Sequence, residues 1–600
     1  MKNIMRNIFR SILILGLCLG MIGGITRIVQ AGAATAPGVE RAEGTISGTV
    51  ICLGLIREST NEVFVSLFDD WGSDPDPIDT VHIGCGDPYQ FDDLPNGTYY
   101  LHAFLDENAT QEGPPDAGEP GSGEPDPIII SATSQSVTDF DLELARYVER
   151  VSLFRGDDGL VELSMDSTAP AISGDGIFVV FYARDSSYNN RGVHIHDREL
   201  DTTQEFSTND YHSGFYSPDI SADGNYVAVA YASSGDAMLL VKEWAAEPEK
   251  LIVIEPIVDN YPEFDAPSIS GNGCRVVFEF KYEDSNEKIV NDVYLYDCDE
   301  DRVYLISEAF NGTDLGNGFS FGPAISDDGN FVAFYSKATD LVDEALTGKY
   351  RIYVRDVSDL TNPVTELIPL PEGYDENVGQ PSISADGRYV AYSYGDSSTH
   401  IFVYDRQEGV TKMVSPVDIE PESPSISADG RYVAFSGWIY EDTTWFVDIY
   451  VHDLHTGQTK LVTRGFEDSS ADENAGAPKI SADGRFVAFW SEDAELVVDD
   501  ENESRDVFVY VNEPALNIEI IGAGTVSKMP NESTFDFDTV VVLTPIAGAN
   551  AVFDGWTGLD VGELIDNGDG TWSITMDTDK VITANFLSSG HTLFLPMIVR

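Results

Sequence analysis

One pattern of polar and apolar positions recurs seven times in the chain. In the clearest copy, Ser423–Phe435, a short P-x-I-S segment leads into Asp-Gly, and Tyr-Val-Ala-Phe follows. The copies start 43 to 58 residues apart, at Pro170, Pro218, Pro267, Pro323, Pro381, Pro424 and Pro478. A repeat of this length indicates an array, a solenoid or a propeller.

Each copy predicts a β-hairpin followed by two more strands. Proline is tolerated where a strand starts, and Asp-Gly is typical of a two-residue type I′ turn, whose central residues both have positive φ. The alternation after the glycine predicts the second strand. Apolar segments such as Ile401–Asp405 and Thr411–Ser415 predict the third and fourth strands. Four strands in a unit of about 50 residues are typical of a propeller blade.

The two ends of the repeat region predict how the array closes. The last copy has a third strand, Val507–Val511, but no fourth, and an unassigned strand at Glu149–Phe154 precedes the first copy. Pairing of these two segments would seal the ring and protect its edges. We therefore predict an all-β chain with a seven-bladed β-propeller over residues 147–512. A six-bladed ring with one degenerate unit is the alternative.

The repeated P-x-I-S-x-D-G-x-x-V-A-F unit resembles the TolB-type, WD40-like β-propeller repeats of secreted bacterial proteins. This resemblance covers residues 147–512 and implies the fold. It does not imply one function, because propellers serve as enzymes, binding proteins and scaffolds.

The first 33 residues are typical of a secretory signal peptide. Lys2, Arg6 and Arg10 precede an apolar stretch, and Ala31-Gly32-Ala33 offers a cleavage site of small residues. An uncleaved anchor is the alternative, although the apolar stretch is short for a membrane span. We expect a secreted or cell-surface protein with no membrane span after cleavage.

Two smaller β modules are predicted beside the repeats. Residues 44–145 contain Phe91–Tyr99 (FDDLPNGTY), which resembles the core of carboxypeptidase-regulatory-like, prealbumin-like sandwiches and implies a spacer or binding module. Residues 515–587 contain GAGTV at 522 and FDGW at 553, which resemble the divergent internalin-type B-repeat of bacterial surface proteins. That resemblance implies a stalk or adhesion module. A short apolar tail occupies residues 588–600.

The formal charge of −69 narrows the class of partner. Nucleic acids and anionic membranes are disfavoured because phosphate contacts need clustered Lys and Arg. The charge favours solubility, cations and basic partners. A solvated extracellular or salt-adapted surface is the simpler explanation.

Four cysteines lie outside the signal segment, and an exported chain permits disulfides. Because each pair is local in the sequence, we hypothesise bonds between Cys52 and Cys85 and between Cys274 and Cys298.

Two acidic loops are candidates for calcium, which takes several carboxylate and carbonyl oxygens. Loop solvation is the alternative, because neither loop has the spacing of an EF-hand. The candidate ligands are Asp106, Asn108, Asp116 and Glu119 in the first loop, and Asp499, Asp500, Asn502 and Asp506 in the second.

The longer connections of the repeats, fourth to first strand and second to third, fall on one face of the predicted ring. They carry aromatic residues beside acids, a combination that suits sugars or peptide segments. Packing between blades is the alternative for each aromatic. The candidate ligand-binding residues are Tyr216, Phe264, Phe321, Tyr374, Trp438 and Trp445.

We assign no catalytic residue, because the sequence contains no nucleophile elbow, zinc-protease motif or phosphate-binding loop. The leading hypothesis is an exported, non-enzymatic, multi-module surface or secreted protein whose propeller is a binding or scaffold platform. Its partner would be a protein or polysaccharide of the cell envelope or its surroundings. The alternatives are a carbohydrate-binding protein and a hydrolase or lyase that acts in the central channel with acids or bound calcium. The oligomeric state stays open.

Overall fold

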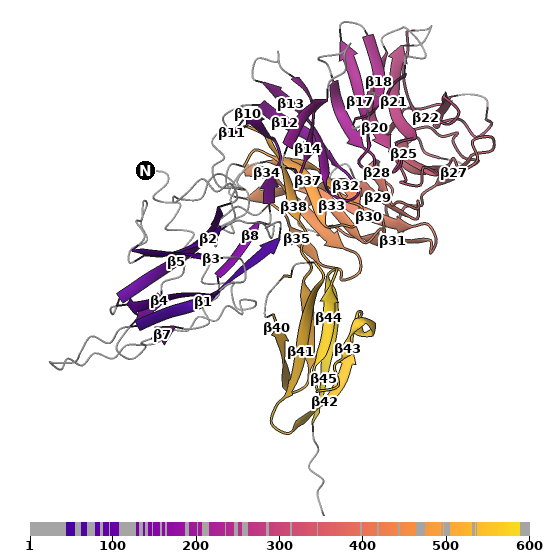
Figure 1. Ribbon diagram of the computed structural model, residues 1–600. Helices are drawn as coiled ribbons and strands as arrows, with labels where there is room; N and C mark the ends of the chain where they lie inside the picture. Colours follow the sequence, from indigo (N-terminus) through magenta and orange to yellow (C-terminus); the bar gives the residue numbers. More distant parts are fainter. Residues whose placement is uncertain are drawn as a thin grey trace, which may run out of the picture.

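The computed structural model describes most residues between 44 and 588, and its elements are almost all strands (Figure 1). The exception is one 3₁₀ turn, η1 (Val561–Glu563). The all-β prediction is therefore confirmed for the described residues, in which no helix could cross a membrane. The longer gaps in the description are 55–61, 69–77, 107–127, 131–135, 186–190, 207–214, 245–249, 255–261, 464–473 and 497–503.

Two sheets precede the repeats. Ile46 and Phe91 of one sheet and Val65 and Leu101 of the other are buried, which gives this region an apolar interior. The first sheet contains β4 (Pro88–Leu94), β1 (Gly44–Gly54), β7 (Ser136–Val137) and β8 (Leu142–Arg146). The second contains β3 (Asp79–Ile83), β2 (Glu62–Phe68), β5 (Gly97–Asp106) and β6 (Ile128–Ile130).

The repeats form consecutive four-stranded antiparallel sheets, here numbered sheets 1 to 7. Sheet 1 contains β12 (Met165–Ile172), β13 (Phe178–Asp185), β14 (Arg191–Asp197) and β15 (Thr202–Phe206). Sheet 2 contains β16 (Phe215–Ile220), β17 (Tyr226–Ser233), β18 (Asp236–Glu243) and β19 (Lys250–Ile254). Sheet 3 contains β20 (Glu263–Ile269), β21 (Arg275–Glu283), β22 (Ile289–Asp297) and β23 (Arg302–Leu305). Sheet 4 contains β24 (Ser320–Ile325), β25 (Phe331–Ser336), β26 (Arg351–Asp356) and β27 (Val364–Leu367). Sheet 5 contains β28 (Val378–Ile383), β29 (Tyr389–Tyr394), β30 (His400–Asp405) and β31 (Val410–Met413). Sheet 6 contains β32 (Glu420–Ile426), β33 (Tyr432–Glu441), β34 (Thr444–Asp453) and β35 (Thr459–Leu461). Sheet 7 is β36 (Ala475–Ile480), β37 (Phe486–Ser491), β38 (Asp506–Val511) and β9 (Val148–Arg150).

The fourth strand of sheet 7 comes from the start of the repeat region, so the predicted closing strand is confirmed. β9 pairs antiparallel with β38, and Val148 lies opposite Tyr510. The closing strand is shorter than expected, because Leu153–Gly156 (β10) instead forms a hairpin with β11 (Gly159–Glu162). The last sheet thus joins two segments that are more than 350 residues apart in the chain.

A closed belt of backbone hydrogen bonds links each sheet to the next. The amide of Ala482 in sheet 7 donates to the carbonyl of Gly174 in sheet 1 at 3.0 Å, which completes the circle. Each of the other links is a backbone amide that donates to a backbone carbonyl of the next sheet. The pairs, with the amide named first, are Gly174 and Ala222, Asp223 and Gly271, Gly271 and Asp327, Asp328 and Ala385, Ala385 and Ala428, and Ala428 and Ala482. Six of the seven equivalent turn positions are Gly or Ala, and the seventh is Asp327, so small side chains let most of the turns approach one another.

The turn after P-x-I-S differs from the predicted type I′ geometry. In sheet 6 only Gly430 has positive φ, at 75°, whereas Asp429 does not. Ser427 pairs with Tyr432 across a four-residue loop, and the Ser427 hydroxyl donates to the Asp429 carboxylate at 2.7 Å. Asp429 therefore serves as a side-chain acceptor that fixes the turn, and the glycine alone supplies the left-handed residue.

The isoleucine of each repeat packs between neighbouring sheets. Ile220, Ile269 and Ile325, for example, belong to three successive apolar clusters and are at most 6% exposed. Because side chains alternate along a strand, the residue before each isoleucine faces the opposite way, toward the ring axis.

The C-terminal module has two small sheets. One contains β39 (Leu516–Ile521), β45 (Lys580–Ser588) and β42 (Ala551–Thr557). The other contains β40 (Gly524–Met529), β41 (Thr539–Ala547), β44 (Trp572–Met576) and β43 (Ile565–Asp566). Phe535, Val541, Leu543 and Ile574 are buried between them, so the module has its own core.

Candidate functional site

The hairpin formed by β33 and β34 carries an exposed aromatic group. Trp438, Tyr440 and Trp445 are 37%, 58% and 49% exposed, and together they are here named the aromatic shelf. Tyr440 lies directly opposite Trp445, with ring centroids 5.0 Å apart. Trp438 and Tyr440 are two residues apart on one strand, so all three side chains share a face of the hairpin. The two tryptophans were expected on a connection between strands, and they lie instead in β33 and β34; their role in ligand binding stays a prediction.

Two carboxylates border the aromatic shelf. Glu420 lies opposite Trp438 in the strand register, and the Glu422 carboxylate accepts a hydrogen bond from Trp438 Nε1 at 3.1 Å. Both acids are exposed. Flat apolar rings beside carboxylate oxygens can contact the C–H face of a sugar and accept its hydroxyl hydrogens.

Phe264 was expected on a loop, and this prediction is wrong. It is 2% exposed and packs against Phe278 and Phe280, with ring centroids 5.4 and 4.9 Å away. The reason is that β20 begins before the repeat proline, at Glu263, and a register shift between Asp265 and Ser268 separates its two halves. Phe264 therefore stabilises the core between sheets and is not accessible to a partner.

Two of the remaining aromatic candidates are partly buried against other rings, and the side chain of the third is not described. Phe321 is half-buried in β24 and contacts the rings of Tyr335 and Tyr350. Tyr374 packs edge-on against Tyr394 and Phe402, as part of a partly buried cluster. Tyr216 lies in β16, but its side chain is outside the described part of the structure.

Most of the calcium candidates lie outside the described residues. These are Asn108, Asp116, Glu119, Asp499, Asp500 and Asn502, together with the side chain of Asp106. Asp506 is described, and it is 2% exposed in β38. It accepts a hydrogen bond from Ser152 and lies 3.7 Å from Arg150, so it ties the closing segment to the ring. The prediction that Asp506 is a surface calcium ligand is wrong.

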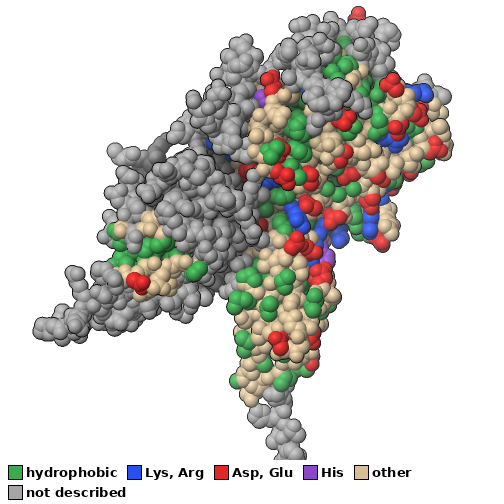
Figure 2. Space-filling view, viewed as in Figure 1, with side chains coloured by type: hydrophobic (Ala, Val, Ile, Leu, Met, Phe, Trp, Pro, Cys, Tyr) green, Lys and Arg blue, Asp and Glu red, His purple; other side chains and the backbone are tan. Residues whose placement is uncertain are grey.

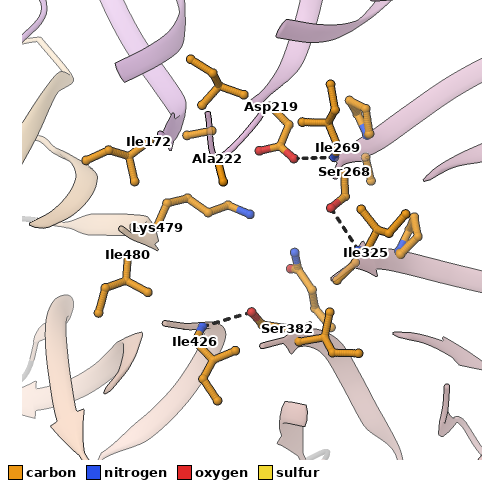
Figure 3. A pocket seen from close by; sticks show the side chains of 18 of the residues that line it. Ile172, Asp219, Ala222, Ser268, Ile269, Ile325, Ser382, Ile426, Lys479 and Ile480 are labelled. Carbon is orange, nitrogen blue, oxygen red and sulfur yellow. Dashed lines mark hydrogen bonds between the residues drawn. The ribbon is translucent and has the colours of Figure 1, made fainter. Parts of the chain in front are cut away.

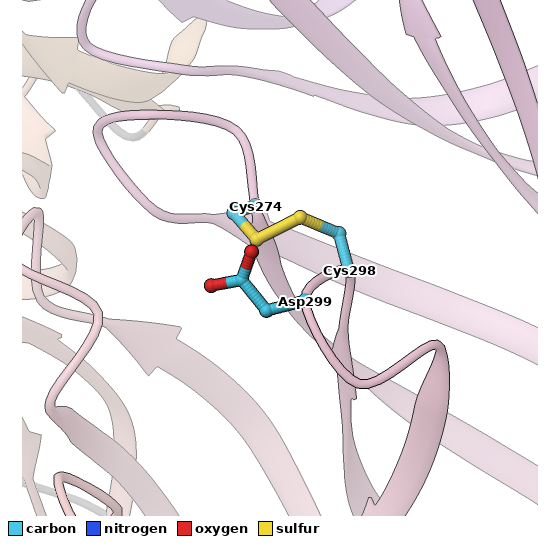
Figure 4. A group of neighbouring side chains, drawn as sticks. All are labelled: Cys274, Cys298 and Asp299. Carbon is cyan, nitrogen blue, oxygen red and sulfur yellow. A yellow bond between two sulfur atoms is a disulfide. The ribbon is translucent and has the colours of Figure 1, made fainter.

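Cys274 and Cys298 form the hypothesised disulfide, which joins the start of β21 to the end of β22 (Figure 4). Asp299 lies beside the two sulfur atoms, but disulfide sulfurs are not thiolates and do not offer a metal site. Cys85 is outside the described residues, so the second hypothesised bond stays a prediction.

The ring encloses a cavity of about 340 Å³ along its axis, lined by the first strands of all the sheets (Figure 3). The residue between the proline and the isoleucine lines it in six of the seven repeats, the exception being Ser425 of sheet 6. In four sheets this side chain accepts a hydrogen bond from the isoleucine amide of the next sheet. The acceptor and donor pairs are Asp219 and Ile269, Ser268 and Ile325, Ser382 and Ile426, and Ser425 and Ile480, at 2.9 to 3.3 Å.

Charged side chains enter this cavity from different sheets. Figure 3 shows Lys479 of sheet 7 and Asp219 of sheet 2 pointing toward one another across it. Burial raises the pKa of the Asp219 carboxyl, and Lys479 partly opposes that shift. Burial also raises the pKa of Asp327, which lines the cavity from sheet 4. Sequence reasoning missed these residues, although the variable position of an otherwise regular repeat was the signal for them.

The C-terminal module is joined to the turns of sheets 6 and 7. Asp579 is 3% exposed, and its Oδ1 accepts a hydrogen bond from Lys460 Nζ at 2.9 Å. The Asp579 carbonyl accepts another from Arg431 at 2.6 Å, and Asp560 lies 2.9 Å from His455 Nε2. Figure 2 shows basic side chains gathered at this junction. These turns are at the opposite face of the ring from the β33–β34 hairpin end, because strand ends alternate between the faces.

Comparison with known proteins gives one family match and several similar folds. A family model described as a divergent InlB B-repeat domain matches residues 515–590, which confirms the expected C-terminal module. No curated protein matches the chain.

Three solved structures illustrate the fold similarity. An oligogalacturonate lyase in complex with manganese is 14% identical, with 61% of this chain and 92% of that chain covered and a TM-score of 0.40. A TolB structure from Agrobacterium tumefaciens is 14% identical, with 58% and 98% covered and a TM-score of 0.33. The β-propeller domain of the trilobed protease from Pyrococcus furiosus is 11% identical, with 61% and 87% covered and a TM-score of 0.36. These TM-scores are low, so the description of the ring rests on its own strand pairing and hydrogen-bond belt.

Proposed function

We propose that this chain is an exported, multi-module binding protein in which a seven-bladed β-propeller presents a recognition surface to a partner in the cell envelope or its surroundings. The division proposed is a signal peptide (1–33), a carboxypeptidase-regulatory-like sandwich (44–145), the propeller (147–512), the B-repeat module (515–587) and a short tail (588–600).

The observation that carries this proposal is the aromatic shelf. Three large rings are exposed together on a hairpin that extends from a hydrogen-bonded sheet. Exposed apolar groups that gather in one place often mark a surface that contacts a partner. A rigid scaffold that holds recognition residues at the end of a projecting element is typical of binding proteins.

The second support is the placement of the C-terminal module. It is held by part-buried hydrogen bonds at the turns of sheet 6, which leaves the β33–β34 hairpin end uncovered by that module. A stalk-like module on one side and a recognition hairpin on the other suits a protein that displays its propeller outward.

Carbohydrate is the partner class that the shelf favours. Its rings stand beside Glu420 and Glu422, which supply hydrogen-bond acceptors for hydroxyl groups. The acidic surface argues for a neutral or amino-bearing glycan over a polyuronate, since like charges repel.

The test is a capture experiment with the full mature chain. The immobilised protein is exposed to an envelope fraction, with and without calcium, and the bound sugars and proteins are identified. We expect a saturable partner that is lost in the Trp438→Ala/Trp445→Ala variant and kept in Phe310→Ala, which removes another exposed ring, 65% exposed. Equal capture by both variants would overturn the shelf as the recognition surface.

A further inference from the structure

The cavity on the ring axis is a second site, separate from the aromatic shelf. Its size, about 340 Å³, lies at the lower end of the range for small-molecule pockets. It is too small for a polysaccharide chain and large enough for a metabolite of a few heavy atoms.

One part of the wall consists of hydrogen-bond donors. Lys479 Nζ extends into the cavity, and within the described residues its side chain forms no hydrogen bond and no ion pair. The next isoleucine around the ring is Ile172. In four other sheets the equivalent amide has a side-chain acceptor from the preceding sheet, but a lysine cannot accept a hydrogen bond. Lys479 therefore enters the cavity as a donor, and Ile172, whose amide has no side-chain acceptor from the described residues of sheet 7, lines the cavity beside it.

Another part of the wall is acidic. One oxygen of Asp219 accepts the Ile269 amide at 2.9 Å, and the carboxylate faces Lys479 (Figure 3). Asp327 stands at a turn position that is Gly or Ala in every other sheet, and its charge acts on Asp219. Two carboxylates, from sheets 2 and 4, thus line the same cavity as one ammonium, from sheet 7.

This separation of charge selects the ligand class. A simple anion would be attracted by Lys479 and repelled by two carboxylates. A simple cation would be attracted by the carboxylates and repelled by Lys479. A molecule with an ammonium and a carboxylate a few ångströms apart satisfies both walls, and charge-assisted hydrogen bonds are the stronger kind. The free-energy cost of desolvating the protein's own charges is offset when those charges are paired on binding.

We propose that the axial cavity binds a small zwitterion of the α-amino acid type. The carboxylate of the ligand would contact Lys479 Nζ and the Ile172 amide, and its ammonium would contact Asp219 and Asp327. No bond is made or broken in this step. The site would let the exported protein respond to free amino acids or related metabolites outside the cytoplasm.

The test is calorimetric titration of the full mature chain with glycine, L-alanine and L-leucine, beside N-acetylglycine and glycinamide, which each lack one charge. We expect saturable binding of at least one free amino acid. The forms with a single charge should bind about tenfold or more weakly, because one charge-assisted contact is lost.

Three variants complete the test. Lys479→Met and Asp219→Asn should each weaken binding about tenfold or more. The asparagine keeps an oxygen that can accept the Ile269 amide, so the ring should stay folded, as an unchanged melting temperature would show. Glu263→Gln removes an exposed charge outside the cavity and should bind normally.

The outcomes distinguish the axial site from the proposed role of the aromatic shelf. Loss of amino acid binding in Lys479→Met with full binding in Trp438→Ala/Trp445→Ala supports an axial zwitterion site. Absence of binding for every amino acid tested overturns it. Binding of N-acetylglycine as tight as that of the free amino acids also overturns it, because a carboxylate alone would then suffice. Turnover of the ligand would assign the cavity to catalysis instead.

Discussion

The ring of Tyr389 in sheet 5 occupies the space beside Gly430 in sheet 6, where a Cβ atom on the glycine would lie 2.0 Å from Tyr389 Cδ2. The glycine of one repeat and the aromatic residue of the previous repeat are therefore one packing unit. The same contact joins Gly484 to Tyr432 and Gly387 to Phe331. This is why the Asp-Gly turn and the aromatic residue two positions after it recur together along the chain.

We expect Gly430→Ala to destabilise the propeller by about 2–4 kcal/mol, from overpacking together with an unfavourable positive φ. Gly457→Ala is the matched control, because Gly457 has a similar φ of 73° and nothing within 4 Å of an added Cβ. The control should lose only about 1 kcal/mol. Denaturant midpoints of both variants measure the difference, and equal losses would show that the ring of Tyr389 moves aside freely.

The closure of the ring predicts the effect of a cross-link. Val148 lies directly opposite Tyr510 in the pairing of β9 with β38. Directly opposite residues on antiparallel strands are the pairs whose Cβ atoms come closest to the separation of a disulfide. The Val148→Cys/Tyr510→Cys variant should form this bond, and its oxidised form should be more stable than its reduced form by about 2–4 kcal/mol. Thermal unfolding with and without reductant provides the comparison. Failure of the two cysteines to join would contradict the closure by β9.

Asp292 predicts a pH dependence of stability. Its carboxyl accepts a hydrogen bond from Ser307 at 2.7 Å, and burial raises its pKa to about 7. The folded protein then binds more protons than the unfolded chain between about pH 4 and 7, so this group contributes stability at low pH that is lost as the pH rises through 7.

The measurement for this group is the urea midpoint between pH 4 and 8. Asp292→Asn removes the titration and should flatten that part of the profile, relative to the wild type. A variant whose pH profile runs parallel to the wild type would refute the assignment to Asp292.

The junction with the C-terminal module contains a buried charge pair. Lys460→Met would leave the Asp579 carboxylate, 3% exposed, without its ion-pair partner at 2.9 Å. We expect a loss of about 3–5 kcal/mol and faster proteolysis between the propeller and the module. Lys281→Met breaks an exposed pair with Glu263 and should cost at most about 1 kcal/mol. Similar proteolysis of the two variants would mean that the junction does not depend on this pair.

Local pattern predicted the strands, the repeat and even the closing segment, because alternation and turn residues are local properties. The turn type was wrong, since Asp429 uses its side chain as an acceptor instead of adopting positive φ. Phe264 was misplaced because β20 begins before the repeat proline and continues through a bulge between Asp265 and Ser268. Lys479 and Asp219 converge only after the ring closes, so their relation depends on contacts between distant repeats.

The most direct test of the binding-platform account is the affinity of the mature chain for purified envelope polysaccharide, measured at low and at high salt. The account predicts saturable binding that survives high salt, because ring stacking is not screened as electrostatic attraction is. It also predicts at least a tenfold loss in Trp438→Ala/Trp445→Ala, since each stacked ring contributes about 1 kcal/mol, and no loss in Phe310→Ala. Binding that disappears at high salt, or that the shelf variant retains in full, would contradict it.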